Sequence, residues 1–175
     1  MTADLRMRSP LADRTSDLAR VGARELAFLS QLSVRVPAGG EAPVPLPTSP
    51  NTWIEHDRRD VLWLGPDEWL VVASPDSEPE ILEELERGLA GADHALVDVS
   101  ANRAAIELEG DGRLGLLEHG CGLDLHPSMW REGMCAQTLL AHIPVILQER
   151  NGATRVFVRP SFAGSLLDWL VDVAS

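Results

Sequence analysis

Short runs in which apolar and polar residues alternate are spread along this chain, and stretches rich in glycine and proline separate them. A period of two is typical of strands, because successive side chains of a strand point to opposite faces. The pattern predicts strands over residues 28–36, 52–55, 60–73 (a hairpin that turns at residues 65–68), 94–100, 103–109, 137–140, 145–150 and 154–159.

The hairpin over residues 60–73 is apolar on both faces. Val61 and Trp63 point to one side of its first strand, and Leu62 and Leu64 point to the other. A strand with two apolar faces must be covered on both sides to keep them from water. We therefore expect this hairpin to lie in the interior of the fold.

Three helices are predicted where the spacing of apolar residues changes to that of a helix. Ser77, followed by a glutamate three residues later, resembles a capping box and predicts a helix over residues 78–90. Asp111 is suited to cap a second helix that ends at Gly120, and Ser161 to cap a final helix near the C-terminus.

Together these elements predict an α+β fold made of two fused β-α-β-β-α-β-like halves, with helices on one face of largely antiparallel sheets. The halves are expected at about residues 25–100 and 101–175 of a single domain, residues 25–175. Four prolines make residues 41–51 a stiff connector. Residues 1–24 carry few large apolar side chains, so we expect a poorly ordered N-terminal arm, or one that a partner orders.

Charge and composition exclude several classes of function. The chain of 175 residues has a formal net charge of −12, which disfavours nucleic acid and anionic membrane surfaces as partners. All 15 of its basic residues are arginine, so no lysine can form a Schiff base or bind a phosphate, and tyrosine is absent. No apolar run reaches the ~20 residues of a bilayer span, and two cysteines with no secretory pattern at the start indicate a cytoplasmic protein.

The residues that could carry chemistry do not form a convincing catalytic or metal site. The spacing of four ligand-capable side chains matches no common zinc pattern: His119, Cys121, His126 and Cys135. A nucleophile could be assembled from Cys121, His119 and Asp124, but the dipole at a helix C-terminus disfavours a thiolate there. No glycine-rich loop follows a strand in the pattern that binds nucleotide phosphates. We expect neither catalytic residues nor a metal on this chain.

Two carboxylates and three tryptophans remain as candidates for binding. Asp98 lies inside an apolar strand and Asp124 between two leucines, and a strand aspartate such as Asp98 is either the cap of a neighbouring turn or a group positioned for a ligand amine. Trp63, Trp69 and Trp130 are core residues or, since tryptophan is enriched at interface hot spots, part of a subunit interface.

Several short motifs occur in an order and at spacings that resemble one family. They are residues 9–13 (SPLAD), 62–70 (LWLGPDEWL), 97–100 (VDVS), 124–127 (DLHP), 137–138 (QT), 161–163 (SFA) and 169–170 (WL). Together they resemble the gamma subunit of bacterial heterotetrameric sarcosine oxidase over nearly the whole chain. One departure is Pro160, where the family pattern has an arginine, so that a salt bridge there would depend on Arg159.

The resemblance implies a fold similar to the folate-binding domain of the glycine-cleavage aminomethyltransferase. It also implies a part in sarcosine oxidation, in which sarcosine, oxygen and tetrahydrofolate give glycine, hydrogen peroxide and methylene-tetrahydrofolate. The partners would be the alpha, beta and delta subunits, which would hold FAD, covalent FMN, NAD, zinc and the folate, while this chain supports assembly. The alternative is an independent folate-binding, aminomethyltransferase-like one-carbon transfer protein that uses Asp98 or Asp124.

Overall fold

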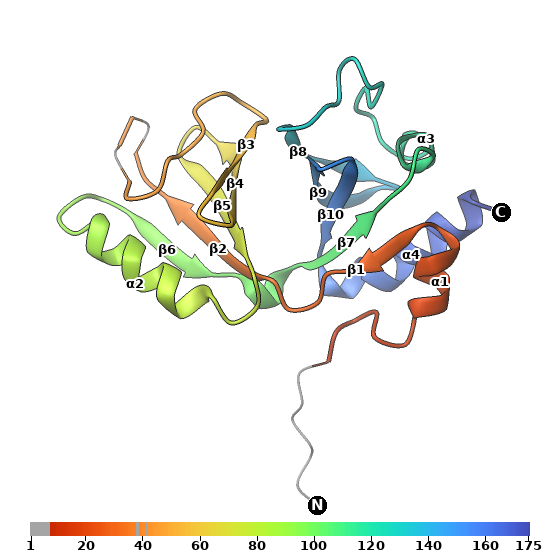
Figure 1. Cartoon of the computed structure of the whole chain (residues 1–175), viewed down its shortest axis with the longest axis horizontal. Coiled ribbons are helices and arrows are strands. Elements are labelled where there is room, and N and C mark those ends of the chain that lie inside the picture. The colour runs from red at the N-terminus through yellow and green to blue at the C-terminus, as the bar shows by residue number, and fades with distance from the viewer. Residues whose placement is uncertain (1–7, 38, 41) are drawn as a thin grey trace, which may run out of the picture.

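The computed structural model describes residues 8–37, 39–40 and 42–175. In this part of the chain the strands form two five-stranded sheets that stand beside each other, one with a single helix and the other with three (Figure 1). All strand pairs within the sheets are antiparallel. The predicted α+β class is confirmed.

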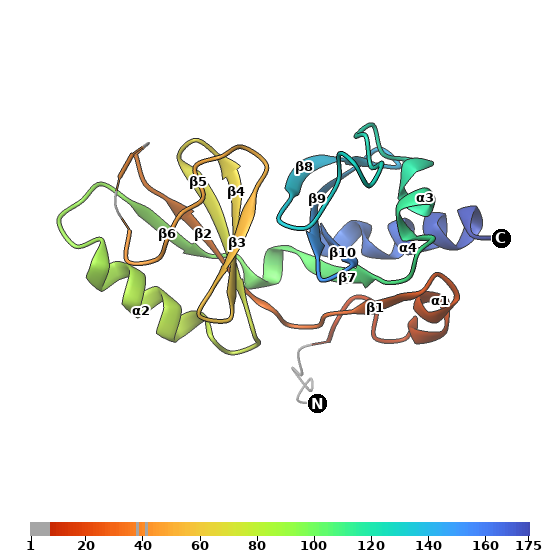
Figure 2. The same cartoon turned by 45° about the horizontal axis from the view of Figure 1, so that its top comes forward.

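The first sheet has the strand order β3-β4-β5-β2-β6 and carries one helix, α2 (Figures 1 and 2). Its elements are β2 (Ser30–Arg35), β3 (Trp53–His56), β4 (Arg59–Gly65), β5 (Glu68–Ala73), α2 (Glu78–Gly88) and β6 (Ala95–Asp98). Ile81 and Leu85 of α2 are fully buried against this sheet. The predicted hairpin, helix and connector are therefore present.

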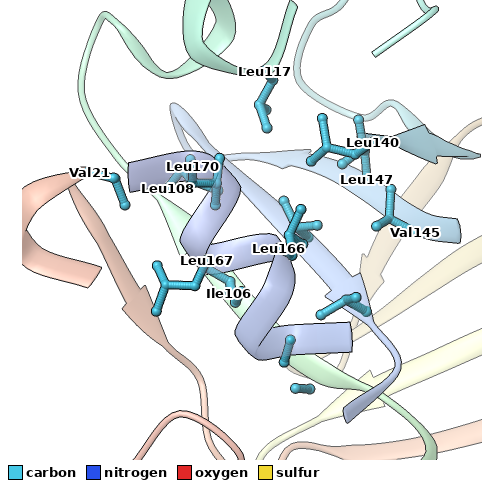
Figure 3. Packing of buried hydrophobic residues seen from close by; sticks show 14 of the residues in the cluster. Val21, Ile106, Leu108, Leu117, Leu140, Val145, Leu147, Leu166, Leu167 and Leu170 are labelled. Atoms are coloured by element: carbon cyan, nitrogen blue, oxygen red, sulfur yellow. The ribbon is translucent and has the colours of Figure 1, made fainter. Parts of the chain in front are cut away.

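The second sheet has the order β1-β7-β10-β9-β8. Its strands are β1 (Ala23–Glu25), β7 (Ala104–Leu108), β8 (Cys135–Leu140), β9 (Ile143–Arg150) and β10 (Ala153–Val158). Three helices accompany it, namely α1 (Thr15–Arg20), α3 (Arg113–Glu118) and α4 (Pro160–Val173), and a 3-10 turn, η1 (Ser100–Asn102), precedes β7. Leu166, Leu167 and Leu170 of α4 pack over this sheet (Figure 3).

The β4–β5 hairpin has the two apolar faces that its sequence predicts. Val61 belongs to the core beneath α2, whereas Leu62 faces the second sheet and packs in a core with Ile146 and Phe157. The order of layers is therefore helix, sheet, sheet, helix, and the hairpin is central because apolar residues fill both of its sides.

The N-terminal segment differs from its prediction. Residues 8–24 form α1 and most of β1, with Leu11, Leu18 and Val21 buried in the core under α4. Three well-spaced apolar side chains are enough to order the segment, because the second sheet leaves an apolar surface for them. The prediction for residues 1–7 lies outside the described residues.

The strands of the first sheet precede residue 100 and those of the second sheet follow it, except β1, and the division of the chain into halves stays a prediction. β1 precedes the first sheet in sequence and yet pairs with β7 of the second, with Arg24 opposite Glu107. The connection from β1 to β2 therefore passes beneath both sheets (Figure 1). No helix in the described ranges is long and apolar enough to cross a membrane.

The predicted helix caps are wrong in detail. Ser77 precedes α2 without a capping hydrogen bond from its side chain, and Gly112 rather than Asp111 precedes α3. The final helix begins at Pro160, one residue before Ser161. Proline suits the first helical position because its fixed φ is already helical and its missing N–H would have had no partner.

Candidate functional site

The two sheets are joined by a buried cluster of charged side chains around Asp60. This carboxylate lies on β4 and is only 3% exposed. It accepts hydrogen bonds from Gln148 Nε2 at 2.9 Å, from Arg150 Nε at 2.9 Å and from Arg155 Nη1 at 2.8 Å. These donors belong to β9 and β10, so one carboxylate of the first sheet binds three side chains of the second.

The cluster extends outward from Asp60 through its two arginines. Arg155 also donates to Glu107 at 2.7 Å, and Arg150 to Glu55 at 2.9 Å. The Arg150 guanidinium lies 5.3 Å from the ring centroid of Trp53, within the range of a cation–π contact. Every charged side chain of this cluster has an oppositely charged partner, so the arrangement joins the two sheets.

A second buried carboxylate, Glu149, holds the loop between α3 and β8. It accepts hydrogen bonds from Trp130 Nε1 at 3.1 Å and Thr154 Oγ1 at 2.5 Å and forms an ion pair with Arg113. Its main-chain oxygen accepts the indole N–H of Trp53 at 2.8 Å. Glu149 is therefore a structural anchor for two tryptophans.

Asp60 and Glu149 were not predicted as buried charged residues, although the sequence contains a weak indication of each. Both are acids at the ends of strand-forming apolar runs: Asp60 directly precedes residues 61–64, and Glu149 lies two residues after Leu147. An acid in such a run has to be paired or hydrogen-bonded if it is buried. Its partners here come from distant segments, which the sequence pattern does not identify.

Asp98 forms the turn that leads from β6 into η1. Its Oδ1 accepts the Ser100 N–H at 2.9 Å and the Ser100 hydroxyl at 2.6 Å. The side chain is exposed and lines a pocket of about 420 Å³ at the junction of the two halves. Asp98 therefore caps this turn, and its role in orienting a ligand amine stays a prediction.

Asp124 lies in a different loop from Asp98. Its Oδ1 accepts the backbone N–H of His126 at 3.0 Å, which closes a turn of two residues, and the carboxylate is exposed. It is not among the residues that line the pocket of Asp98. The structure thus does not bring the two candidate carboxylates into one site.

The four ligand-capable side chains of the zinc hypothesis are occupied by separate contacts. His119 Nδ1 lies 2.7 Å from the Gly115 carbonyl oxygen, and His126 Nδ1 lies 2.7 Å from Ser128 Oγ. Among the described residues no three His, Cys, Asp or Glu side chains come together in a way that could hold a metal ion. This donor set does not fit zinc.

Gly120, just after α3, is required for packing against the final helix. A Cβ atom at this position would lie 2.6 Å from the indole ring of Trp169 on α4. Glycine is required for this close approach of the α3 end to the final helix. Packing against Trp169 therefore accounts for the first glycine of the Gly-Cys-Gly sequence at residues 120–122.

Cys135 is a buried thiol of low reactivity. Burial raises its pKa to about 12, although a hydrogen bond to the Trp63 carbonyl opposes the shift. At pH 8 only roughly 1 in 10,000 molecules would carry the thiolate, the form that reacts. Cys121 is half-buried.

We expect Ellman's reagent to modify one thiol of the folded isolated chain at pH 8, and a second only after unfolding in guanidinium chloride. The fast thiol is Cys121, so a Cys121→Ser variant should show no fast reaction. Two thiols reacting at the same rate in the folded chain would contradict the burial of Cys135.

The three tryptophans considered for an interface differ in exposure. Trp69 and Trp130 are buried within the chain, and their indole N–H groups donate to the Pro47 carbonyl oxygen at 2.8 Å and to Glu149. Trp63 is half-buried and lines an apolar pocket with Trp69 and Pro66. Trp63 is the most exposed of the three, and the subunit-interface role of Trp63, Trp69 and Trp130 stays a prediction.

Comparison with known proteins identifies relatives over nearly the whole chain. The model of the family described as "Sarcosine oxidase, gamma subunit family" matches residues 25–175. The sarcosine oxidase subunit gamma of Corynebacterium sp. (strain U-96) is 32% identical over 162 residues, which cover 87% of this chain and 78% of that protein. The subunit gamma of an Arthrobacter species is 34% identical over 182 residues, covering 94% and 88%.

Solved structures agree with these matches. A chain of the heterotetrameric sarcosine oxidase from Corynebacterium sp. U-96 superposes with a TM-score of 0.87 at 31% identity, covering 96% of this chain and 94% of that chain. The glycine cleavage system aminomethyltransferase T from Bartonella henselae superposes with a TM-score of 0.65 at 13% identity, covering 90% of this chain and 48% of that one. The second likeness confirms the predicted fold and carries no further argument about activity.

Proposed function

This chain belongs to the sarcosine oxidase gamma subunit family, and from this membership we propose that it is the gamma subunit of a heterotetrameric sarcosine oxidase. The complex is an oxidoreductase that demethylates sarcosine oxidatively. Sarcosine, oxygen and tetrahydrofolate are converted to glycine, hydrogen peroxide and methylene-tetrahydrofolate. The role of this chain in that complex is structural, in a cytoplasmic assembly with alpha, beta and delta subunits.

The observation that carries the proposal is the whole-chain likeness to one chain of a solved heterotetramer. A TM-score of 0.87 with more than nine-tenths of both chains covered leaves no large insertion or missing segment between the two. Relatives that share the complete fold and about a third of their residues are expected to share their place in an assembly.

The contacts inside the chain support a structural role. Buried carboxylates bind arginines across the sheets, the predicted folate candidates Asp98 and Asp124 form turns, and the Cys135 thiol is buried. We therefore place the cofactors on the partner subunits, with FAD, covalent FMN, NAD and zinc as the set that the family resemblance implies. Within the complex these groups would supply the oxidation chemistry, while the residues of this chain hold its own two sheets together.

The alternative is an independent folate-binding, aminomethyltransferase-like one-carbon transfer protein. The likeness to an aminomethyltransferase covers less than half of that enzyme at 13% identity, so it supports the shared fold alone. The gamma subunit relatives, in contrast, match in sequence and in length. The subunit proposal is therefore favoured.

Expression of all four subunits with an affinity tag on this chain tests the proposal. We expect the tag to recover a flavin-containing complex that forms hydrogen peroxide from sarcosine. The matched control has the same tag on an unrelated chain of similar acidity. Recovery of the tagged chain alone would count against the proposal, and saturable binding of tetrahydrofolate by the isolated chain would favour the alternative.

A further inference from the structure

The pocket of about 420 Å³ lies where the two halves of the chain meet. Segments from several distant parts of the sequence line it: the N-terminal residues 8–10, the connection between β1 and β2, the start of α2, the η1 turn and the first residue of α4. The connection and the η1 turn both lie at the base of the two sheets (Figures 1 and 2). The pocket is thus formed by the whole fold rather than by one loop.

Arg103 lines this pocket with an unpaired charge. The side chain is partly buried, and among the described residues its guanidinium has neither an ion-pair partner nor a hydrogen-bond acceptor. Burial and the repulsion of nearby Arg159 lower the pKa of Arg103, but an arginine remains charged at neutral pH. An unpaired charge that is partly withdrawn from water is unfavourable for the isolated chain.

In the part of the chain that the structure describes, the other arginines with little exposure are all paired, which makes Arg103 unusual. Those with side chains 13–18% exposed are Arg59, Arg113, Arg150 and Arg155, and their partners are Glu84, Glu149, Asp60 and, for Arg155, also Glu107. Each of these four partly buried arginines is therefore neutralised by a carboxylate of the same chain. Arg103 lacks such a partner in the described part of the chain.

The acids of the same pocket do not neutralise Arg103. Asp98 is bound by Ser100, and Glu78 Oε2 accepts the Ser30 hydroxyl at 2.5 Å. Glu25 and Asp76 also line the pocket, and neither forms an ion pair with Arg103. The backbone at Arg103 is fixed, because its carbonyl oxygen accepts a hydrogen bond from Gln31 Nε2 at 2.9 Å.

Phe28 gives the pocket an exposed aromatic wall. The residue is 46% exposed and has φ +62°, a left-handed conformation that is rare for a bulky side chain. Strained residues persist where the surrounding structure imposes them, and they cluster at sites that bind other molecules. A large apolar ring is thus held at the surface beside an unpaired cation.

We propose that this pocket, which we call the Arg103 pocket, is a docking site for a segment of another subunit that presents an aspartate or glutamate side chain to Arg103 and an apolar side chain to Phe28. The inference rests on the proposed function, because it assigns a surface to the assembly role. A guanidinium pairs with a carboxylate through two parallel hydrogen bonds, which gives both strength and orientation. A protein segment fits better than a free anion, since it can fill the apolar side of the pocket at the same time as it pairs with Arg103.

The experiment uses the co-expressed complex with the tag on this chain, and it compares the variants Arg103→Gln, Arg103→Lys and Phe28→Asn with the wild type. Asparagine tolerates the left-handed conformation, so Phe28→Asn removes the ring without changing the backbone. The matched control is Arg20→Gln, which removes an exposed arginine on the far part of α1. The readouts are the amount of partner subunits recovered over a series of salt concentrations and the melting temperature of each isolated chain.

We expect Arg103→Gln to weaken partner binding by roughly tenfold or more, Arg103→Lys and Phe28→Asn to weaken it less, and Arg20→Gln to leave it unchanged. The isolated Arg103→Gln chain should melt at or above the wild-type temperature, because it loses an unpaired charge. Equal recovery of partners by the wild type and Arg103→Gln would overturn the docking site alone. Failure of the wild-type chain to recover any partner would instead overturn the proposed function, and saturable tetrahydrofolate binding that Arg103→Gln abolishes would reassign the pocket to a small ligand.

Discussion

Replacing Asp60 with asparagine is expected to lower the free energy of unfolding of the isolated chain by about 3 kcal/mol. The substitution keeps the size of the side chain but removes the charge that Arg150 and Arg155 share at 2.9 and 2.8 Å. Breaking a buried ion pair on one side is costly because the other charge stays in a poorly solvated place. The loss stays near the lower end of the usual range, about 3–5 kcal/mol, because Glu55 and Glu107 still bind the two arginines.

The midpoint of guanidinium chloride unfolding, followed by circular dichroism, measures this change. Glu83→Gln is the matched control: its carboxylate pairs with Arg87 on the surface, both side chains are at least 70% exposed, and such a pair contributes about 0–1 kcal/mol. A loss for Asp60→Asn no larger than that of the control would show that the charged cluster does not join the sheets.

The buried carboxylates of this chain are paired with donors of the same chain, which favours a structural role. An active site needs polar groups that remain available to a substrate, whereas Asp60 and Glu149 both bind donors within the fold. The energy of these contacts serves to hold two sheets and a long loop in one arrangement. A rigid body of this kind is suited to present a surface to other subunits.

Much of the fold was predictable because its signals are local. The period-two pattern of the hairpin over residues 60–73 identified β4 and β5 and also the two faces that need cover, one beneath α2 and one against the second sheet. The spacing of apolar residues likewise located α2 and the final helix. Such patterns depend on neighbouring residues only, so one sequence is enough to find them.

The features that were not predicted depend on distant residues. The order of residues 8–24 comes from Leu11, Leu18 and Val21 entering a core whose surface is built by α4 and β7, some 80 or more residues later. The pairing of Arg24 with Glu107 has the same origin. Among the candidate site residues, turn-capping was one role predicted for Asp98, and the structure shows both Asp98 and Asp124 in turns. Nothing in the sequence indicates that Arg103 is unpaired, because the lack of a partner is a property of the folded chain.

Replacing Glu149 with glutamine is expected to destabilise the chain by about 3–4 kcal/mol, the largest effect that we predict. The carboxylate is 4% exposed and serves three donors: Arg113, Trp130 and Thr154. Glutamine has one acceptor oxygen and an NH₂ group that itself donates, so at least one of these donors loses its acceptor. The Arg113 guanidinium is only 13% exposed and its Nε already lacks a partner, so its charge would be left buried and unpaired.

A double-mutant cycle shows whether the destabilisation comes from the unpaired charge of Arg113 or from a loss of packing. If the unpaired charge of Arg113 causes the destabilisation, the double variant Arg113→Met, Glu149→Gln should be more stable than Glu149→Gln alone, since methionine removes the charge and keeps much of the apolar stem. Glu118→Gln, on the exposed end of α3, is the matched control and should change the free energy of unfolding by no more than about 0.5 kcal/mol. Strictly additive losses in the cycle would contradict the coupling between Glu149 and Arg113. Coupling of the expected sign would show that the long loop before β8 is held by one buried charge pair, because Trp130 of that loop is bound to the same carboxylate.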